Sequence, residues 1–250
     1  GEIMPAAKIN IGNVEITSLS DGILEFDLCN FFPEIPAESW DGYRQHLTEE
    51  QHVRFNLACF LIRSDGHTII VDTGLGPKPA NAPETPWGEL LNDLTAQGLR
   101  PEDIDMVVMT HLHRDHVGWN LTAGKPTFPK ACYLIPQRDW DYWTKPEVVK
   151  DAEHIRNQVL PLKDHGVIEF MGDDYQITDE LTAVSTPGHT PGHVSILIDS
   201  QGERAYILGD VAHSPAQAHY TDWCPIFDVE PDLPRNGLRD TAAASPAPTW

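Results

Sequence analysis

The sequence predicts an α+β fold of the αββα type, in which two packed β-sheets lie between outer layers of helices. Three observations favour this fold. Apolar, strand-like runs alternate along the chain with segments whose apolar residues recur at helical spacing. Histidine and aspartate side chains follow directly after several of these runs. With 250 residues, 40% of them hydrophobic, the chain is also long and apolar enough to bury a substantial core in one domain.

The N-terminal part of the chain predicts three strands and one helix. Residues 14–19, 57–63 and 68–71 are rich in apolar and β-branched residues, and Ser-Asp-Gly at 64–66 supplies a hairpin turn between the last two. Residues 87–97 have apolar side chains at helical spacing and end before a glycine. This segment therefore predicts a helix that leads into the next strand.

The rest of the chain continues the alternation, and no internal repeat is visible. Helices are expected at 138–143 and 148–162, and strands at 106–109, 131–135, 181–185, 194–198 and 206–208. We expect residues 1–231 to form the single folded domain.

The most informative segment follows directly on an apolar strand and reads Thr-His-Leu-His-Arg-Asp-His at 110–116. His111 and His113 are two apart in extended backbone, so they project toward one side. Asp115 and His116 fall on the following turn, where they could reach a second point a few ångströms away. Imidazole and carboxylate are the usual protein ligands of zinc-like ions. A solvated polar loop is the alternative, but four ligand-type side chains at this spacing favour two neighbouring metals.

Two later segments supply further ligand-type side chains. Residues 186–193 read Thr-Pro-Gly-His-Thr-Pro-Gly-His, and their Pro and Gly residues rigidify a loop that presents His189. Residues 206–210 form another apolar strand that ends Gly-Asp, where the glycine permits close approach of the backbone. Asp210 is therefore placed to bridge two ions. His193 precedes the next strand, and we expect it to support the loop and not to bind a metal.

In this order, HxHxDH, a GHTPGH loop and a strand that ends in GD resemble the metallo-β-lactamase superfamily. More narrowly, the pattern is similar to its lactonase and organophosphate-hydrolase branch, which includes N-acyl homoserine lactonases and methyl-parathion-hydrolase-like enzymes. The resemblance extends from the first strands to about Asp228 and includes Val-Asp-Thr-Gly at 71–74. It implies the αββα sandwich and metal-dependent hydrolysis, but it is a weak guide to the substrate.

The resemblance also implies a set of ligands for two divalent ions, zinc first, with manganese, cobalt or iron as alternatives. It places one ion on His111, His113 and His189, a second on Asp115 and His116, and Asp210 between them. A hydroxide shared by the ions would be the nucleophile, and we assign Asp115 and Asp210 to catalysis. Asp72 and Thr110 match positions that support the site, although a turn carboxylate and a strand-end hydroxyl would explain them equally well.

The C-terminus departs from the family pattern. Family members follow the bridging aspartate with a helix, another strand and a final histidine, whereas this chain has no histidine after His219. Residues 232–250 contain no Ile, Val or Phe and three prolines, so we expect a poorly ordered tail. The sandwich would then lack its closing strand and helix, and the second metal would lack a ligand. His213, His219 or water could substitute, but we favour a pocket-lining role for His213.

Composition narrows the range of partners. Seventeen Lys and Arg against thirty-eight Asp and Glu give a net charge of −21, which argues against nucleic acid and anionic thioester substrates. Solvation of the surface is the other meaning of this charge. No apolar run approaches the ~20 residues of a membrane span, and the N-terminus has no signal-peptide pattern. Four unpaired cysteines fit a cytoplasmic location. A homodimer that covers the exposed apolar face is left open.

Several aromatic residues are candidates for lining the substrate pocket. The segment 28–36 precedes a helix expected from Ser39 and could form a flap over the metals, and Trp119, Trp223 and Phe227 could line the same cavity. Together these residues indicate an apolar pocket for an acyl chain or an aromatic leaving group. With the resemblance, this implies a small lactone or ester as substrate. Lactone hydrolysis comes first, aryl ester or organophosphate triester hydrolysis second and β-lactam hydrolysis third. A metal-binding protein with little catalysis is the alternative from a different class.

Overall fold

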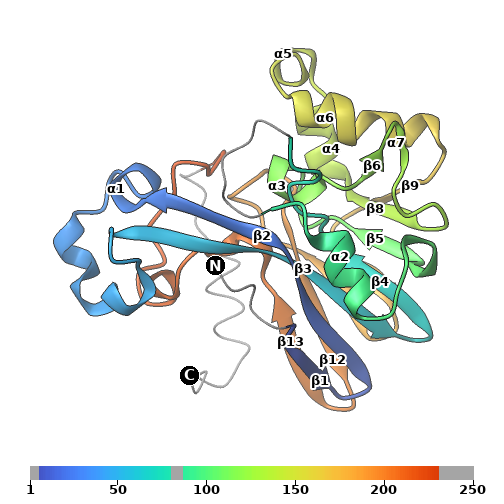
Figure 1. Cartoon of the computed structure of the whole chain (residues 1–250), viewed down its shortest axis with the longest axis horizontal. Coiled ribbons are helices and arrows are strands. Elements are labelled where there is room, and N and C mark those ends of the chain that lie inside the picture. The colour runs from blue at the N-terminus through green and yellow to red at the C-terminus, as the bar shows by residue number, and fades with distance from the viewer. Residues whose placement is uncertain (1–5, 80–86, 231–250) are drawn as a thin grey trace.

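The computed structural model describes residues 6–79 and 87–230 of the chain. Its larger sheet has seven strands in the order β1-β2-β3-β4-β5-β8-β9 (Figure 1). Neighbours are antiparallel up to β4, and β4, β5, β8 and β9 run parallel. The strands span Lys8–Ile11 (β1), Val14–Asp27 (β2), His52–Ser64 (β3), His67–Val71 (β4), Met106–Val108 (β5), Cys132–Pro136 (β8) and Ile168–Met171 (β9).

The second sheet is a four-stranded antiparallel meander in the order β10-β11-β12-β13. Its strands span Tyr175–Thr178 (β10), Leu181–Ser185 (β11), Val194–Ser200 (β12) and Glu203–Ile207 (β13). A separate short hairpin pairs β6 (Leu121–Thr122) with β7 (Lys125–Pro126). All the predicted strands are present, although β2 and β3 are much longer than the sequence indicated.

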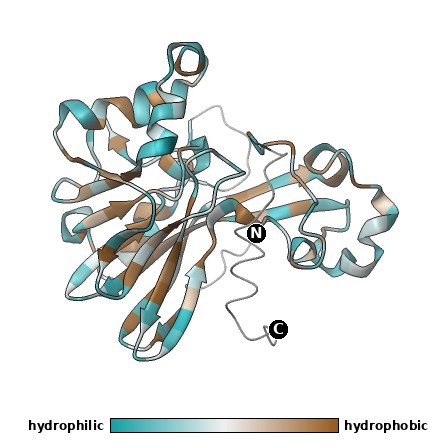
Figure 2. Ribbon diagram, turned by 180° about the vertical axis from the view of Figure 1, so that it is seen from behind, coloured by the Kyte–Doolittle hydropathy of each residue, from teal (hydrophilic) through white to brown (hydrophobic). Residues whose placement is uncertain are grey.

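The two sheets pack face to face through one apolar core. Alternation along the strands divides their side chains between two layers: Val108 faces the second sheet, whereas Val107 faces the helices. Ile62 and Leu134 of the larger sheet share the first of these cores with Ile196 of the smaller one. Figure 2 shows these hydrophobic strands inside hydrophilic loops. Because the parallel strands end at one edge of the sheet, the loops after β4 and β5 lie together there.

Most α-helices cover one side of the larger sheet, and α1 belongs to a separate lobe beside the sandwich (Figure 1). In the described part of the chain one helical layer and the two sheets make three of the four αββα layers, because no described helix packs on the outer face of the smaller sheet. The expected tail at 232–250 lies outside the described residues. Helical elements on the larger sheet span Leu90–Ala96 (α2), Pro101–Asp103 (η2), Arg114–Val117 (α3), Gln137–Trp143 (α4), Pro146–Val149 (α5), Glu153–Gln158 (α6) and Leu160–Asp164 (α7).

The prediction of a single helix at 148–162 is wrong, because α5, α6 and α7 are three short helices. Two features interrupt the segment. Val159 has φ −120°, outside the helical range, and Pro161 in the first turn of α7 has no N–H to continue a helix. The apolar side chains of the short helices nevertheless reach the same core, where Ile155 and Leu162 are fully buried. Helical spacing of apolar residues therefore indicated the buried face correctly but not the breaks.

The long ends of β2 and β3 carry a lobe beside the sandwich, visible on the left in Figure 1. It contains α1 (Leu28–Phe31), η1 (Ala37–His46) and η4 (Pro215–Ala218), and its core is the buried set Leu28, Phe31, Phe32, Trp40, Val53, Ala216 and Trp223. The helix expected from Ser39 is thus a 3₁₀ helix that starts two residues earlier. The lobe joins chain segments that are far apart in sequence, because residues between Leu28 and Val53 pack against Ala216 and Trp223.

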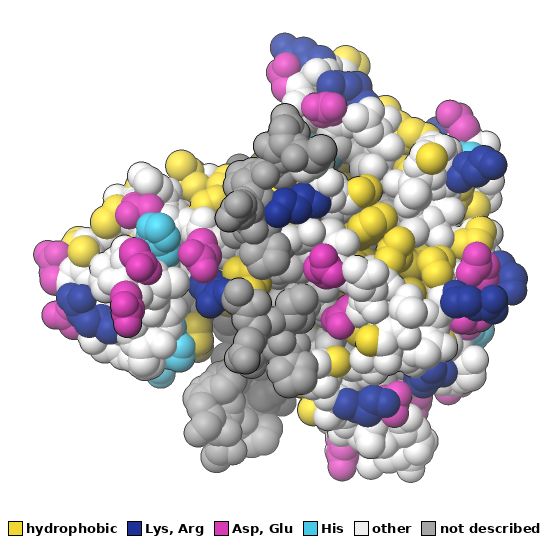
Figure 3. Space-filling view, in the orientation of Figure 1, with side chains coloured by type: hydrophobic (Ala, Val, Ile, Leu, Met, Phe, Trp, Pro, Cys, Tyr) yellow, Lys and Arg dark blue, Asp and Glu magenta, His cyan; other side chains and the backbone are white. Residues whose placement is uncertain are grey.

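Charged side chains are scattered among uncharged and hydrophobic ones on the visible face (Figure 3). In Figure 3 the lobe shows several carboxylates, and Lys and Arg side chains elsewhere lie among acidic ones. The exposed acids of the lobe include Glu34, Glu38, Asp41, Glu49 and Glu50. Among the described residues, no helix combines the length and apolar composition needed to cross a membrane.

Candidate metal centre

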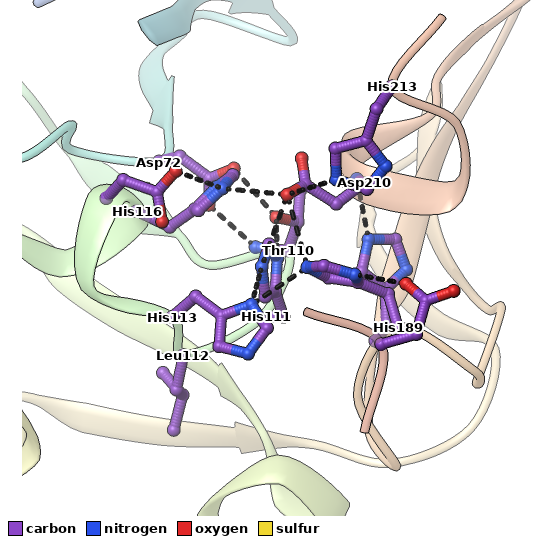
Figure 4. A network of polar contacts seen from close by, with 12 residues as sticks. Asp72, Thr110, His111, Leu112, His113, His116, His189, Asp210 and His213 are labelled. Carbon is purple, nitrogen blue, oxygen red and sulfur yellow. Dashed lines mark hydrogen bonds and ion pairs between the residues drawn. The ribbon is translucent and has the colours of Figure 1, made fainter. Parts of the chain in front are cut away.

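Four chain segments meet at the ends of the strands and point polar side chains toward one another (Figure 4). They are the turn after β4 with Asp72, the loop from β5 into α3, the loop at 186–193 between β11 and β12, and η3 (Gly209–Val211) after β13. The first two come from the larger sheet and the last two from the smaller one. The site therefore lies across the edge of the sandwich, and both sheets must be in place to form it.

Three imidazoles converge on one point. His113 Nδ1 lies 3.1 Å from His111 Nε2 and 2.8 Å from His189 Nε2, and the three nitrogens lie within 4.8 Å of one another. His111 and His189 are buried. Burial lowers the pKa of His113 to about 2 and that of His111 well below its usual value, and neighbouring histidines add to both shifts. At neutral pH these two rings are uncharged, which is the form that binds a metal.

Asp210 occupies the centre of a ring of histidines. Its Oδ2 lies 3.1 Å from His213, 3.2 Å from His189, 3.4 Å from His116 and 3.8 Å from His111, each distance measured to Nε2. Burial opposes the charge of this carboxyl, but His116 and His213 hold its pKa well below the usual range. One carboxylate oxygen within reach of four imidazole nitrogens is the arrangement expected of a group that bridges two cations.

The backbone that presents Asp210 is fixed by a glycine and a histidine. Gly209 has φ +59°, and a Cβ on it would lie 2.6 Å from His193 Nε2, so this position accepts only glycine. The same His193 Nε2 accepts the N–H of Asp210 at 3.0 Å, while its Nδ1 lies 2.8 Å from Thr186 Oγ1. The prediction that His193 supports the site is confirmed.

Asp72 orients the motif from the opposite side. It accepts hydrogen bonds from the N–H of Thr110 at 2.8 Å and from its hydroxyl at 2.7 Å, and its Oδ2 lies 2.8 Å from His116 Nδ1. These contacts leave His116 Nε2 directed at Asp210. Asp72 has φ +61°, an uncommon backbone conformation that its buried contacts over-determine. The predicted supporting hydrogen bonds of Asp72 and Thr110 are therefore present.

A cavity of about 960 Å³ opens above these side chains. Phe31 and Phe227 line it together with His113, His189 and Asp210, as the sequence predicted for the two phenylalanines. Further apolar lining comes from Leu24, Phe26, Phe55 and Leu57. A ligand seated in this cavity would therefore contact both the polar cluster and an apolar, largely aromatic wall.

The prediction is wrong for the two tryptophans. Trp119 is buried in the core between sheet and helices, where its Nε1 donates to Asp21. Trp223 packs against Trp40 in the lobe, with ring centroids 4.9 Å apart. Neither lines the cavity. The indole rings follow the commoner behaviour of large aromatic side chains, which is core packing with the N–H satisfied where a partner is near.

The paired sheets, the order of the ligand-type segments and their convergence on one carboxylate agree with a match to a family of known proteins. A sequence model of the metallo-beta-lactamase superfamily matches residues 54–245. The chain belongs to the metallo-beta-lactamase superfamily. Its α+β class and its superfamily, both predicted from the motifs, are therefore confirmed.

Individual members of the superfamily are distant in sequence. An N-acyl homoserine lactonase of Bacillus thuringiensis is 23% identical over 208 residues, which cover 77% of this chain and 78% of that protein. The N-acyl homoserine lactonase AttM of Rhizobium radiobacter is 28% identical over 167 residues, covering 60% of this chain and 62% of that protein.

Two solved structures of the superfamily share the fold closely. The hydrolase AbOPH has a TM-score of 0.83 at 23% identity and covers 98% of this chain and 87% of its own. AidC, described as a dizinc quorum-quenching lactonase in complex with a product, has a TM-score of 0.78 at 22% identity, with 96% and 86% covered. At these identities the structural likeness shows the fold alone.

Asp115 and His213 differ in how closely they approach the cluster. Asp115 lines the cavity, and its Oδ2 lies 3.8 Å from His116 Nε2, yet it belongs to none of the groups of ligand atoms within 4.8 Å. His213 also lines the cavity, and its Nε2 forms such a group with His189 and Asp210. His219 lies elsewhere, 2.7 Å from the Tyr43 hydroxyl. Of the two histidine substitutes considered for the second ion, only His213 is in place.

The sequence analysis missed one functional candidate, Asp228. Its Oδ1 lies 2.8 Å from Nδ1 of His189, and only 2% of its side chain is exposed. The N–H groups of Val229 and Glu230 donate to the carbonyls of His189 and Gly188, so this segment is tied to the loop by its backbone as well. No periodic pattern marks this segment, and the only signal is a carboxylate directly after the apolar pair Ile-Phe. Carboxylate partners of this kind orient histidine ligands in metalloproteins.

We expect Asp228→Ala to weaken metal binding without loss of the fold. Burial disfavours the charged form of His189, but Asp210 and Asp228 together raise its pKa to about 9, so Asp228 makes this ring more basic and fixes its direction. Loss of such a partner typically costs about 10- to 100-fold in metal affinity. Zinc titration against a chromogenic chelator measures the effect. Asp222→Ala, at an exposed position of the same segment, is the control; equal affinities in both variants would contradict the role of Asp228.

Proposed function

We propose that the chain is a metal-dependent hydrolase that opens neutral lactones, with N-acyl homoserine lactones as the substrate class. The proposal rests on the position of Asp210 Oδ2. This oxygen lies among four imidazole nitrogens in the lining of a cavity that has an aromatic wall. The curated relatives are lactonases, which favours a lactone over the other esters that the same chemistry could cleave.

The donor set fits two divalent ions of the zinc type. Neutral imidazole and carboxylate are borderline and hard ligands, and zinc is commonly bound by such mixed sets. The first ion would be held by His111, His113 and His189. The second would be held by His116 and Asp210, with Asp115 and His213 as further candidates. When bound, such ions polarise an ester carbonyl and lower the pKa of a coordinated water toward neutrality.

The chain's own residues orient the metal ligands and form an apolar cavity wall that excludes water from a bound substrate. Asp210 keeps the two ligand groups at a short separation, because its one oxygen faces both. Asp72 and Asp228 each contact the Nδ1 of a histidine ligand and so direct its Nε2 inward. Phe31 and Phe55 lie with ring centroids 4.8 Å apart and offer an apolar surface for an acyl chain. The lactone carbonyl would then lie over Asp210 with its acyl chain on the aromatic wall.

A panel of substrates tests the proposed function. We expect zinc-loaded protein to hydrolyse N-hexanoyl homoserine lactone with a kcat/KM at least about tenfold above that for an aryl ester, an aryl phosphate triester or a β-lactam, a difference of about 1.4 kcal/mol in the barrier. A higher value for the triester or the β-lactam would replace the lactone as substrate. Zinc-loaded protein that hydrolyses none of the four would support a metal-binding protein with little catalysis.

We also propose that His213 completes the second metal site in place of a C-terminal histidine. Its Nε2 lies 3.1 Å from Asp210 Oδ2, and the ligand atoms of His213, Asp210 and His189 lie within 4.8 Å of one another. The expected result is two zinc ions per chain for the unchanged protein and one for His213→Ala, measured by elemental analysis after gel filtration. His219→Ala should keep both, because this ring contacts Tyr43 instead. Two ions retained by His213→Ala would show that His213 only lines the cavity.

A further inference from the structure

Asp139 in α4 is a buried carboxylate that contacts both loops of the three-histidine group. None of its surface is exposed. One of its oxygens, Oδ2, accepts the N–H of Leu112 at 2.8 Å, and the other, Oδ1, accepts the N–H of Gly192 at 2.7 Å. Leu112 lies between His111 and His113 in the sequence, and Gly192 follows His189 by three residues. Each oxygen thus holds one of the two loops that bring these histidines together.

The loops are pressed against α4 as well as bonded to it. A Cβ on Gly192 would lie 2.1 Å from the backbone nitrogen of Asp139, so no side chain fits there. Leu112 is also held through its carbonyl, whose oxygen lies 3.1 Å from Nε2 of His154 in α6. At the base of the loops, the N–H of Val194 donates to the carbonyl of Thr110 at 2.9 Å. Besides the contact between the His113 and His189 rings, the backbones of the two loops are therefore tied together at two places.

From this geometry we infer that Asp139 is a positioning residue: it fixes the separation between the loop that carries His111 and His113 and the loop that carries His189. The two oxygens of one carboxylate have a fixed spacing, so the two N–H groups that they accept are held at a fixed spacing as well. The backbone contact at Thr110 alone would leave the loops free to hinge apart. The affinity of the three-histidine group for a divalent ion then depends on a residue that touches neither ion nor substrate. This inference rests on the metal centre proposed above.

Zinc affinity of the metal-free protein tests this role. In Asp139→Asn the amide keeps one acceptor oxygen but turns its NH₂ group toward the second N–H, so one loop is released. We expect the tighter zinc dissociation constant, measured by competition with a chromogenic chelator, to rise by about 10- to 100-fold. Circular dichroism of the metal-free variant confirms that it is folded under the conditions of the titration. A merely structural role would lower the melting temperature and leave this constant unchanged.

Asp21→Asn is the matched control. Asp21 is equally buried and accepts hydrogen bonds from the N–H groups of Leu75, Gly76 and Leu90 and from the indole of Trp119, none of which adjoins the three histidines. We expect it to lower the melting temperature without a change in the tighter dissociation constant. If Asp139→Asn behaves in the same way, the inference is wrong.

Gly192→Ala gives a second, independent test, and it decides the question if Asp139→Asn does not fold. Its methyl group must push the loop away from α4, so the same zinc constant should rise. Gly172→Ala, where a Cβ meets nothing within 4 Å, should leave it unchanged. An unchanged constant in Gly192→Ala would overturn the inference. The unchanged protein is titrated first: failure to bind zinc there would contradict the proposed function, whereas tight binding that none of the variants alters contradicts only the role of Asp139.

Discussion

Asp210→Ala should lower lactone hydrolysis by about 10³-fold or more and leave the protein unable to retain two metal ions. The carboxylate is the only group of the site whose one oxygen approaches four of the described imidazole nitrogens, so its loss separates the two ligand sets. It also removes the negative charge that offsets two cations. A loss of this order is what removal of a principal electrostatic group from a site produces.

Steady-state rates and zinc content, measured on the same sample, check this expectation. Asp41→Ala is a suitable control, because Asp41 is exposed and pairs only with Arg44 on the surface of the lobe. It should behave as the unchanged protein does. If Asp210→Ala kept both ions and more than about a tenth of the activity, Asp210 would not bridge the site. His116 and Asp115 would then have to hold the second ion without it.

His113→Ala should also abolish hydrolysis, and it should do so without unfolding the protein. The His113 ring contacts His111, His189 and Trp143, and it makes no hydrogen bond to the backbone of any described residue. Its removal takes one of three donors from the first ion but disturbs no sheet or helix. The expected observations are a rate near background, at most one ion per chain and an unchanged far-UV circular dichroism spectrum.

His67→Ala serves as the reference for His113→Ala, since His67 is exposed at the hairpin end of β4. The comparison must be made at matched metal content, so that a rate difference reports on the arrangement of the site and not only on its occupancy. Turnover equal to that of the unchanged protein would show that His113 is not a ligand, and would leave His111 and His189 as the only histidines of that group.

The positions of the candidate ligands at strand ends could be predicted from sequence because the rules that place these residues are local. An apolar run of strand length ends at the core boundary, so the residues that follow, such as His111 and Asp210, must lie at the edge of a sheet. Parallel pairing of β4 with β5 then brings Asp72 close to the same edge. The alternation of Val107 and Val108 between two cores follows from the same period of two residues.

The remaining features depend on contacts between distant segments. Asp228 lies 39 residues from His189 in sequence, and Asp139 lies 27 residues from Leu112, so neither spacing signals the contact that the fold creates. The lengths of β2 and β3 were underestimated because their outer halves pack in the lobe, whose core is assembled from both ends of the chain. Trp119 was misplaced for a similar reason, since its partner Asp21 lies almost a hundred residues earlier.

Lactone hydrolysis by the histidine and aspartate cluster should require bound divalent metal. The most direct test follows N-hexanoyl homoserine lactone hydrolysis and zinc content together while the protein is stripped with a chelator and then reloaded. We expect the rate to fall to background as zinc is removed and to return in proportion to the zinc restored. Full hydrolysis by protein shown by elemental analysis to contain no metal would contradict it.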